Sequence, residues 1–208
     1  GQGSYGGGGA AEPVTIWEYK VDNNGNATIT KYSGNASAVA VPSKIDGYTV
    51  TKIGSSAFYG NTALRSVTMP NTVTEIGGWA FQDCTNLSSI SLPPNITTLG
   101  SHVFNGCSSL TEIFIPKTLE SGYNAFSGSG VVTAEFEYGM TVIPGGMFSG
   151  AKNLKNVTIP ETVVTIGSSA FFNCTSLETI KLPQYVTKIE GWAFQDCTNL
   201  SSISLPPN

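Results

Sequence analysis

The sequence predicts a solenoid of stacked β-coils that forms a single domain, and two observations carry this prediction. The eighteen residues 78–95 return without any change at 191–208. Phenylalanine also recurs every 22 or 23 residues, at Phe58, Phe81, Phe104, Phe126, Phe148, Phe171 and Phe194. Self-similarity at a fixed period is the signature of repeat proteins, in which each unit buries its core only against its neighbours.

Composition removes several classes of function. Charged residues make up 12% of the chain, and the net charge is −4. This charge is too weak and of the wrong sign to follow a phosphate backbone or an anionic membrane, so no nucleic acid partner is expected. No apolar run approaches eighteen residues, so no membrane insertion is expected in this segment. The abundant serine, threonine, asparagine and glycine are typical of secreted bacterial proteins, although no signal peptide opens the chain.

The first 38 residues are expected to form a tether and a cap. Residues 1–13 are rich in glycine and predict a flexible tether. Two alternating runs flank an Asn/Gly cluster and predict a β-hairpin within residues 14–38. The spacing from Asp22 is close to that of a calcium loop, but Ala27 stands where that loop needs glycine, so a turn is favoured. Because a solenoid needs an atypical terminal unit, we expect this hairpin to be the N-terminal cap.

Residues 39–208 form the array, with about seven units of 22–23 residues. One unit has the pattern L-x-x-V-x-M/L/I-P-x-x-V-x-x-I-G-x-x-A-F-x-x-C. The alternating first stretch predicts a strand that ends at proline, which cannot donate to a ladder. A shorter strand then ends at a glycine with an expected positive φ, and a helical or 3₁₀ turn places the phenylalanine in the core. The period and the L-x-x-L-x-L core at 64–69 predict a leucine-rich-repeat solenoid, mostly β, with a parallel sheet on its concave face.

One stretch, 126–143, departs from this pattern. It lacks the cysteine, Glu137 stands in the proline position, and two single-residue deletions shorten the units around it. We expect a distorted coil here. Correcting the register for the deletions turns Ala134 and Phe136 inward and Glu135 outward, whereas the uncorrected register would bury two glutamates at a high cost.

The unit pattern resembles the BspA-like, Treponema-type leucine-rich repeat family of bacterial surface proteins. One unit shows the residues that carry the resemblance: Ile159-Pro160, Ile166-Gly167, Ala170-Phe171, Cys174 and Leu177. The resemblance covers residues 14–208, and the leading segment 41–50 also looks like that of the family. It implies a cell-surface or secreted module that binds host or neighbouring-cell proteins. It implies no catalytic residues, since the family pattern contains none.

No catalytic, cofactor or metal site is predicted. One repeat position, three residues after the phenylalanine, holds every cysteine: Cys84, Cys107, Cys174 and Cys197. We expect these thiols to be reduced and to face the core, and the alternatives are bridges between neighbouring coils or a metal site. His102 is the only histidine and is expected on the surface. Because no acid, base, nucleophile and ligand converge, no enzyme activity is expected.

The outward strand positions contain a candidate binding site. Most of these positions are small and polar, but Phe114 stands between Glu112 and Glu135, with Tyr138 just beyond the strand. An exposed aromatic side chain beside charges is typical of a protein contact. The alternative is that Phe114 packs under the distorted coil.

A second aromatic set lies close to the phenylalanine turns and comprises Tyr59, Trp79, Tyr123, Phe172 and Trp192. These rings either contact a ligand or only cover the convex edge. Exposed planar rings such as Trp79 and Trp192 would suit a carbohydrate or cell-wall ligand.

The expected function is a non-enzymatic, adhesion-type module, extracellular or at the cell surface, that binds an extracellular protein of a host or neighbouring cell. The alternatives are a carbohydrate- or cell-wall-binding module and a structural spacer in a larger surface protein. The chain ends at Asn208 directly after a predicted strand. This ending predicts a truncated array whose uncapped last coil is available for end-to-end self-contact.

Overall fold

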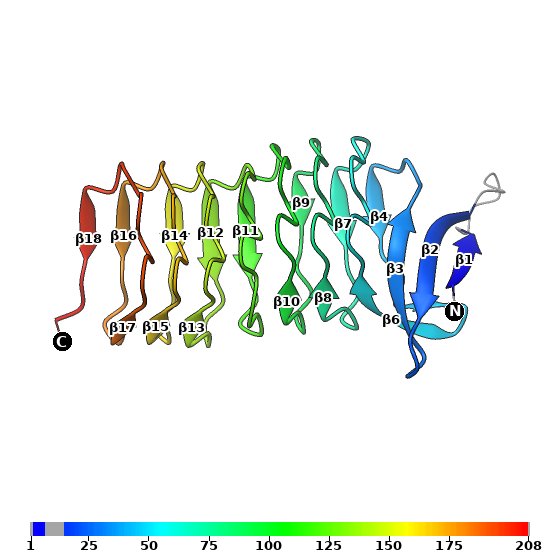
Figure 1. Cartoon of the computed structure of the whole chain (residues 1–208), viewed down its shortest axis with the longest axis horizontal. Coiled ribbons are helices and arrows are strands. Elements are labelled where there is room, and N and C mark those ends of the chain that lie inside the picture. Colours follow the sequence, from blue (N-terminus) through cyan, green and yellow to red (C-terminus); the bar gives the residue numbers. More distant parts are fainter. Residues whose placement is uncertain (1, 7–14, 208) are drawn as a thin grey trace.

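The chain winds into a rod of stacked β-coils, with the N-terminal cap at one end and β18 at the other (Figure 1). The computed structural model describes residues 2–6 and 15–207. Within these residues there are strands and turns but no helix. All pairings between the strands of successive coils are parallel. The predicted solenoid with parallel sheets is therefore confirmed.

Two rows of strands run along the rod. One row, the long-strand face, consists of β4 (Ala38–Ala40), β7 (Ser66–Thr68), β9 (Ser89–Ile90), β11 (Glu112–Ile115), β12 (Thr133–Phe136), β14 (Asn156–Thr158), β16 (Thr179–Lys181) and β18 (Ser202–Ser204). The other row, the short-strand face, consists of β6 (Tyr48–Ile53), β8 (Glu75–Ile76), β10 (Thr98–Leu99), β13 (Val142–Ile143), β15 (Thr165–Ile166) and β17 (Lys188–Ile189). The phenylalanine turns close each coil between these two faces.

A continuous stack of phenylalanine rings runs through the core. From Phe58 to Phe194, the centroids of successive rings lie 4.7–6.0 Å apart, and their planes differ by 5–16°. The rings from Phe58 to Phe171 are almost fully buried. This nearly parallel stacking follows from the repeat, because each coil places its ring directly beside the equivalent ring of the next coil.

The phenylalanine turns are not helical, which corrects the expected helical or 3₁₀ turn. The residues two before and two after each core phenylalanine have positive φ, as Trp79 (56°) and Asp83 (59°) do around Phe81. A helix needs negative φ throughout, so these left-handed positions divide the segment into separate bends. The backbone N–H groups at these positions donate to carbonyls of the next coil. The N–H of Trp79, for example, donates to the Ser101 carbonyl at 3.0 Å.

The glycine that ends the short strand serves close packing, and the expected positive φ is absent there. A Cβ added to Gly77 would stand 2.6 Å from the backbone nitrogen of Ser55 in the preceding coil. A Cβ on Gly100 or Gly167 would also meet backbone atoms of the preceding coil. Backbone atoms cannot move aside as a flexible side chain can, so only glycine fits at these positions.

The N-terminal hairpin caps the array as predicted. Its strands, β2 (Thr15–Val21) and β3 (Asn26–Tyr32), are antiparallel, and β3 also pairs with β6 in parallel. The rings of Trp17 and Tyr32 lie 6.0 and 5.2 Å from that of Phe58. The cap therefore covers the first coil and begins the aromatic stack.

The start of the chain differs from the expected flexible tether. Its residues Gln2–Gly6 form β1, which is antiparallel to β2. Residue 1 and the remaining tether residues, 7–13, lie outside the described residues. A glycine-rich segment forms this strand because β2 offers it an edge to pair with, so pairing outweighs propensity. A smaller hairpin joins β5 (Lys44–Ile45) to β6 through Asp46 and Gly47, both with positive φ.

The coil that contains β11 pairs with the following coil on one face and with the preceding coil on the other. On the long-strand face, the described ladder joins β11 to β12 but not to β9. On the short-strand face, Ser121 bridges to Thr98 of the preceding coil, and the ladder stops before β13. Strand β12 itself is regular, with Ala134 and Phe136 buried and Glu135 exposed. The corrected register is thus confirmed: β12 pairs with both of its neighbours, and the long-strand ladder is interrupted between β9 and β11 and between β14 and β16.

Met147 compensates for the shortened unit before it. The unit around Phe126 lacks the inward residue that Leu99 supplies one coil earlier. A Cβ on Gly122 would stand 2.7 Å from Met147 Cε, and the Met147 side chain is fully buried. The other units have alanine or valine at this position. The long, flexible methionine therefore fills the space that the deletion leaves.

We expect Phe104→Ala to lower the free energy of unfolding by about 3–5 kcal/mol, because it opens a cavity in the ring stack. Urea denaturation followed by circular dichroism measures this loss. Phe114→Ala is the matched control, since this ring points outward, and its expected change is within about 0.5 kcal/mol. Equal losses in the two variants would contradict the assignment of one ring to the core and the other to the surface.

Candidate functional site

The outward side chains of the long-strand face form two columns in the predicted register. In the first column, the pairs are Ser66 with Ser89, Glu112 with Thr133, Thr133 with Asn156, and Thr179 with Ser202. In the second, they are Phe114 with Glu135, Glu135 with Thr158, and Lys181 with Ser204. Successive residues of a strand alternate between the core and solvent, so small polar groups cover most of this face.

The candidate site around Phe114 interrupts this small polar surface. Phe114 is 45% exposed, whereas Ile113 and Ile115 on either side of it are buried. The alternative that Phe114 packs under the distorted coil is therefore wrong. The ring borders a shallow depression of about 360 Å³, whose lining includes Glu112 and Glu135. The depression opens where the ladder between β9 and β11 is interrupted.

Charge and exposure distinguish this patch from the rest of the face. Two ion pairs occur among the described side chains, and neither includes Glu112 or Glu135. Both carboxylates are thus available to an external cation beside an exposed ring. Tyr138 lies two residues beyond β12 and is 73% exposed, but it does not line the depression. Three of the four residues predicted for this site therefore line one depression, and Tyr138 does not.

Trp79 and Trp192 lie elsewhere, at the phenylalanine turns, and 113 residues separate them in the sequence. The structure does not bring them together with Phe114 or with each other. Trp79 stacks on His102, with ring centroids 6.1 Å apart and an interplanar angle of 9°. The His102 ring is partly exposed, and its Nδ1 lies 2.6 Å from Ser101 Oγ. Trp192 is 69% exposed and borders a hollow of its own.

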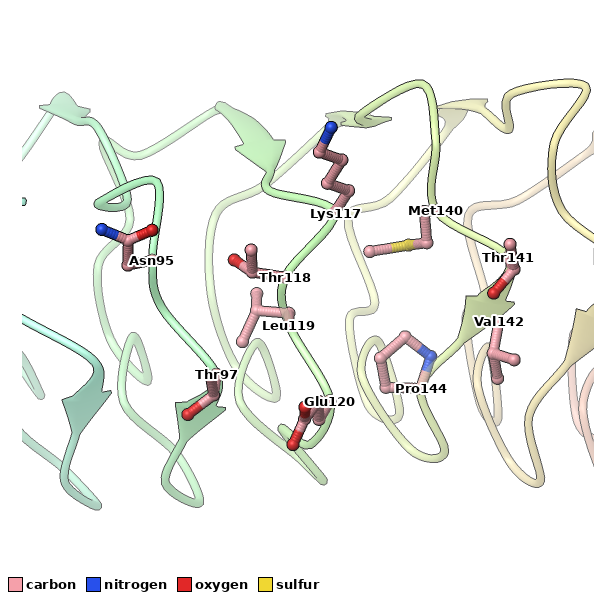
Figure 2. A pocket seen from close by; sticks show the side chains of 10 residues that line it. All are labelled: Asn95, Thr97, Lys117, Thr118, Leu119, Glu120, Met140, Thr141, Val142 and Pro144. Carbon is pink, nitrogen blue, oxygen red and sulfur yellow. The ribbon is translucent and has the colours of Figure 1, made fainter.

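A cleft of about 630 Å³ marks the interruption on the short-strand face (Figure 2). Figure 2 shows Lys117, Leu119 and Glu120 on one side and Met140 and Val142 on the other. In the described part of the chain, no hydrogen bond joins the backbone on the two sides at this level. The sequence did not indicate this cleft. Its lining mixes both charges with apolar and hydroxyl groups and favours no ligand class.

The cysteines are free thiols that the repeat places in equivalent positions. Each Sγ donates to the carbonyl of a core phenylalanine in the preceding coil, and the distances are 3.0–3.2 Å. Cys84, Cys107 and Cys174 are buried, and Cys197 is partly exposed. Among the described residues, no group of three or more His, Cys, Asp or Glu side chains is placed to hold a metal ion. The described residues also contain no helix with the length and hydropathy to cross a bilayer.

These features define a class of protein, the leucine-rich-repeat solenoids. Within this class, the model of the BspA type leucine-rich repeat region matches residues 41–150 and 120–208, in six copies. The chain therefore belongs to the BspA-type leucine-rich repeat family, and the resemblance seen in the sequence is confirmed. No match is found among curated proteins.

Solved structures of bacterial leucine-rich repeat proteins are similar over nearly the whole chain. A leucine-rich cell surface protein from Faecalibacterium prausnitzii is 32% identical with a TM-score of 0.67, and the match covers 97% of this chain and 54% of that one. A leucine-rich repeat protein from Bacteroides ovatus is 28% identical with a TM-score of 0.74, and the match covers 94% of this chain and 53% of that one. A leucine-rich repeat protein from Treponema pallidum is 31% identical with a TM-score of 0.65, and the match covers 93% of this chain and 81% of that one. The chain thus spans about half the length of the first two proteins.

We expect the buried thiols to react slowly in the folded protein. Burial raises the pKa of the Cys84 thiol to about 11 and also raises that of Cys107. The reactive thiolate is therefore scarce near pH 8 and becomes common only as the pH approaches 11. A disulfide exchange reagent should label Cys197 first in the native protein and all four cysteines in guanidinium. Fewer than four reactive thiols in guanidinium would instead reveal a bridge.

Proposed function

We propose that the chain is a non-enzymatic, adhesion-type module that binds an extracellular protein of a host or neighbouring cell. The observation that carries this proposal is the exposed Phe114 ring, flanked by two carboxylates without ion pairs on a face of otherwise small polar groups. A rigid solenoid face presents such a patch without any ordering cost on binding.

The chemistry of the patch indicates the kind of surface that it contacts. An exposed aromatic ring beside a depression acts as an anchor once a partner covers it and excludes water. Glu112 and Glu135 favour a partner with arginine or lysine next to an apolar group. The small polar side chains along the two columns let a partner approach the sheet closely.

The proposed location is extracellular or at the cell surface. Membership of the BspA-type family supports this location, and so does the likeness to a cell surface protein of Faecalibacterium prausnitzii. Because the chain spans about half of that protein, the proposal concerns a module and not the activity of a whole surface protein.

We expect the double variant Phe114→Ala/Tyr138→Ala to lose its partner. Host extracellular proteins captured by the parent chain, identified and then titrated should bind this variant at least about tenfold more weakly, since a central aromatic anchor contributes about 2 kcal/mol or more. Tyr59→Ala is the matched control, because it removes an exposed aromatic from the turn edge. Equal affinities of the parent and the double variant would refute the site, and the absence of any captured protein would count against adhesion.

The carboxylates predict a salt dependence of the same complex. We expect Glu112→Gln/Glu135→Gln to weaken binding at about 50 mM NaCl but to change it little at about 500 mM, because salt screens exposed charges. Biolayer interferometry with the captured partner at both concentrations measures the effect. A parent affinity that is independent of salt would contradict the proposed role of the two charges.

A further inference from the structure

A hollow on the edge formed by the phenylalanine turns has the features of a small-molecule site. Its volume is about 440 Å³, which falls within the range of about 300–1,000 Å³ that is usual for ligand pockets. Its lining comprises Tyr123, Asn124, Ser149, Ser169, Phe172, Trp192 and Gln195. These residues belong to four successive coils, so the hollow is elongated across the repeat.

The hollow exists because small residues occupy two neighbouring coils between larger ones. The position two before the core phenylalanine is Gly146 and then Ser169 in these coils, but Trp192 in the coil that follows. A Cβ on Gly146 would overlap the Tyr123 ring. Glycine at 146 therefore lets this ring, which is 53% exposed, lie against the next coil as a fixed wall of the hollow.

Two hydroxyl groups of the lining form no hydrogen bond with another described residue. Ser149 and Ser169 are 7% and 2% exposed. Among the described residues, neither side chain takes part in a hydrogen bond, although both line the hollow. In the described part of the chain, Thr72 Oγ1 is the only buried side-chain oxygen without a partner, so the Ser149 and Ser169 hydroxyls are open to the hollow, where a ligand can replace water as their partner. The amide side chains of Asn124 and Gln195 add donors and acceptors at the rim.

We propose that this hollow binds a short neutral glycan. A sugar ring has a face of C–H groups that stacks on an aromatic plane, and hydroxyl groups around its edge that need hydrogen-bonding partners. Trp192, Tyr123 and Phe172 supply the aromatic planes, and the serine hydroxyls and the two amides supply the partners. No charged side chain lines the hollow, so neutral hexoses and N-acetylhexosamines fit better than acidic sugars or a charged peptide.

Trp79 has the same local sequence as Trp192 but does not line this hollow. The His102 ring stacks on Trp79. The nearby amide of Gln82 donates to Asn105 at 3.4 Å, and that of Asn105 donates to the Ser127 carbonyl at 3.1 Å. These two amides are thus engaged within the protein.

An array of neutral and acidic oligosaccharides tests the proposal on the whole chain, followed by calorimetric titration with the best neutral one. We expect Trp192→Ala to weaken binding at least about tenfold, since it removes an aromatic platform. Ser149→Ala/Ser169→Gly should weaken it by about tenfold through lost hydrogen bonds, and glycine suits the positive φ of residue 169. Trp79→Ala and Phe114→Ala are the matched controls and should keep the affinity of the parent.

Several results would overturn the glycan site. They are binding to no neutral oligosaccharide, binding to acidic ones only, or equal losses in the Trp79→Ala and Trp192→Ala variants. If Trp192→Ala abolished capture of the extracellular protein instead, the hollow would be a protein contact. Because Phe114→Ala leaves the hollow intact, failure of the glycan site and failure of the proposed protein contact give different patterns across the variants.

Discussion

The repetition of one backbone path, coil upon coil, is the constraint on which the rest of this structure depends. Most coils bond to the next on the long-strand face, on the short-strand face and at the phenylalanine turn. These bonds require successive coils to follow the same path at nearly the same length. The ring stack and the thiol hydrogen bonds then follow, because each coil sets the same group beside its counterpart.

Sequence predicts well the features that depend on period and alternation alone. The inward and outward residues, the cap hairpin and the register of β12 all came from those two properties. The turn conformation did not, because left-handed backbone is imposed by bonds to the next coil on residues as different as Trp79, His102 and Ser169. The role of glycines such as Gly77 was also missed, since it depends on a backbone approach between residues far apart in the chain.

The two candidate sites also differ in whether the sequence could predict them. Phe114 was found from the sequence because a single large residue stands out in a column of small ones. The sequence placed three lining rings of the other hollow, Tyr123, Phe172 and Trp192, in its second aromatic set, but it did not predict the hollow itself, which arises from small residues in neighbouring coils. Its available signal was the run of small residues at 146, 149 and 169, which becomes meaningful only once the coils are aligned by their phenylalanines.

The packing of Met147 has a consequence for how such an array can change over evolution. The methionine fills a space in the preceding unit, so the units around Phe126 and Phe148 pack well only when both are present side by side. A recombination event that copied one without the other would leave either an empty core position, at a cost of about 2–5 kcal/mol, or a methionine without room. The identical stretches 78–95 and 191–208 lie on either side of this pair. Exchange between these identical stretches would move the pair as one block.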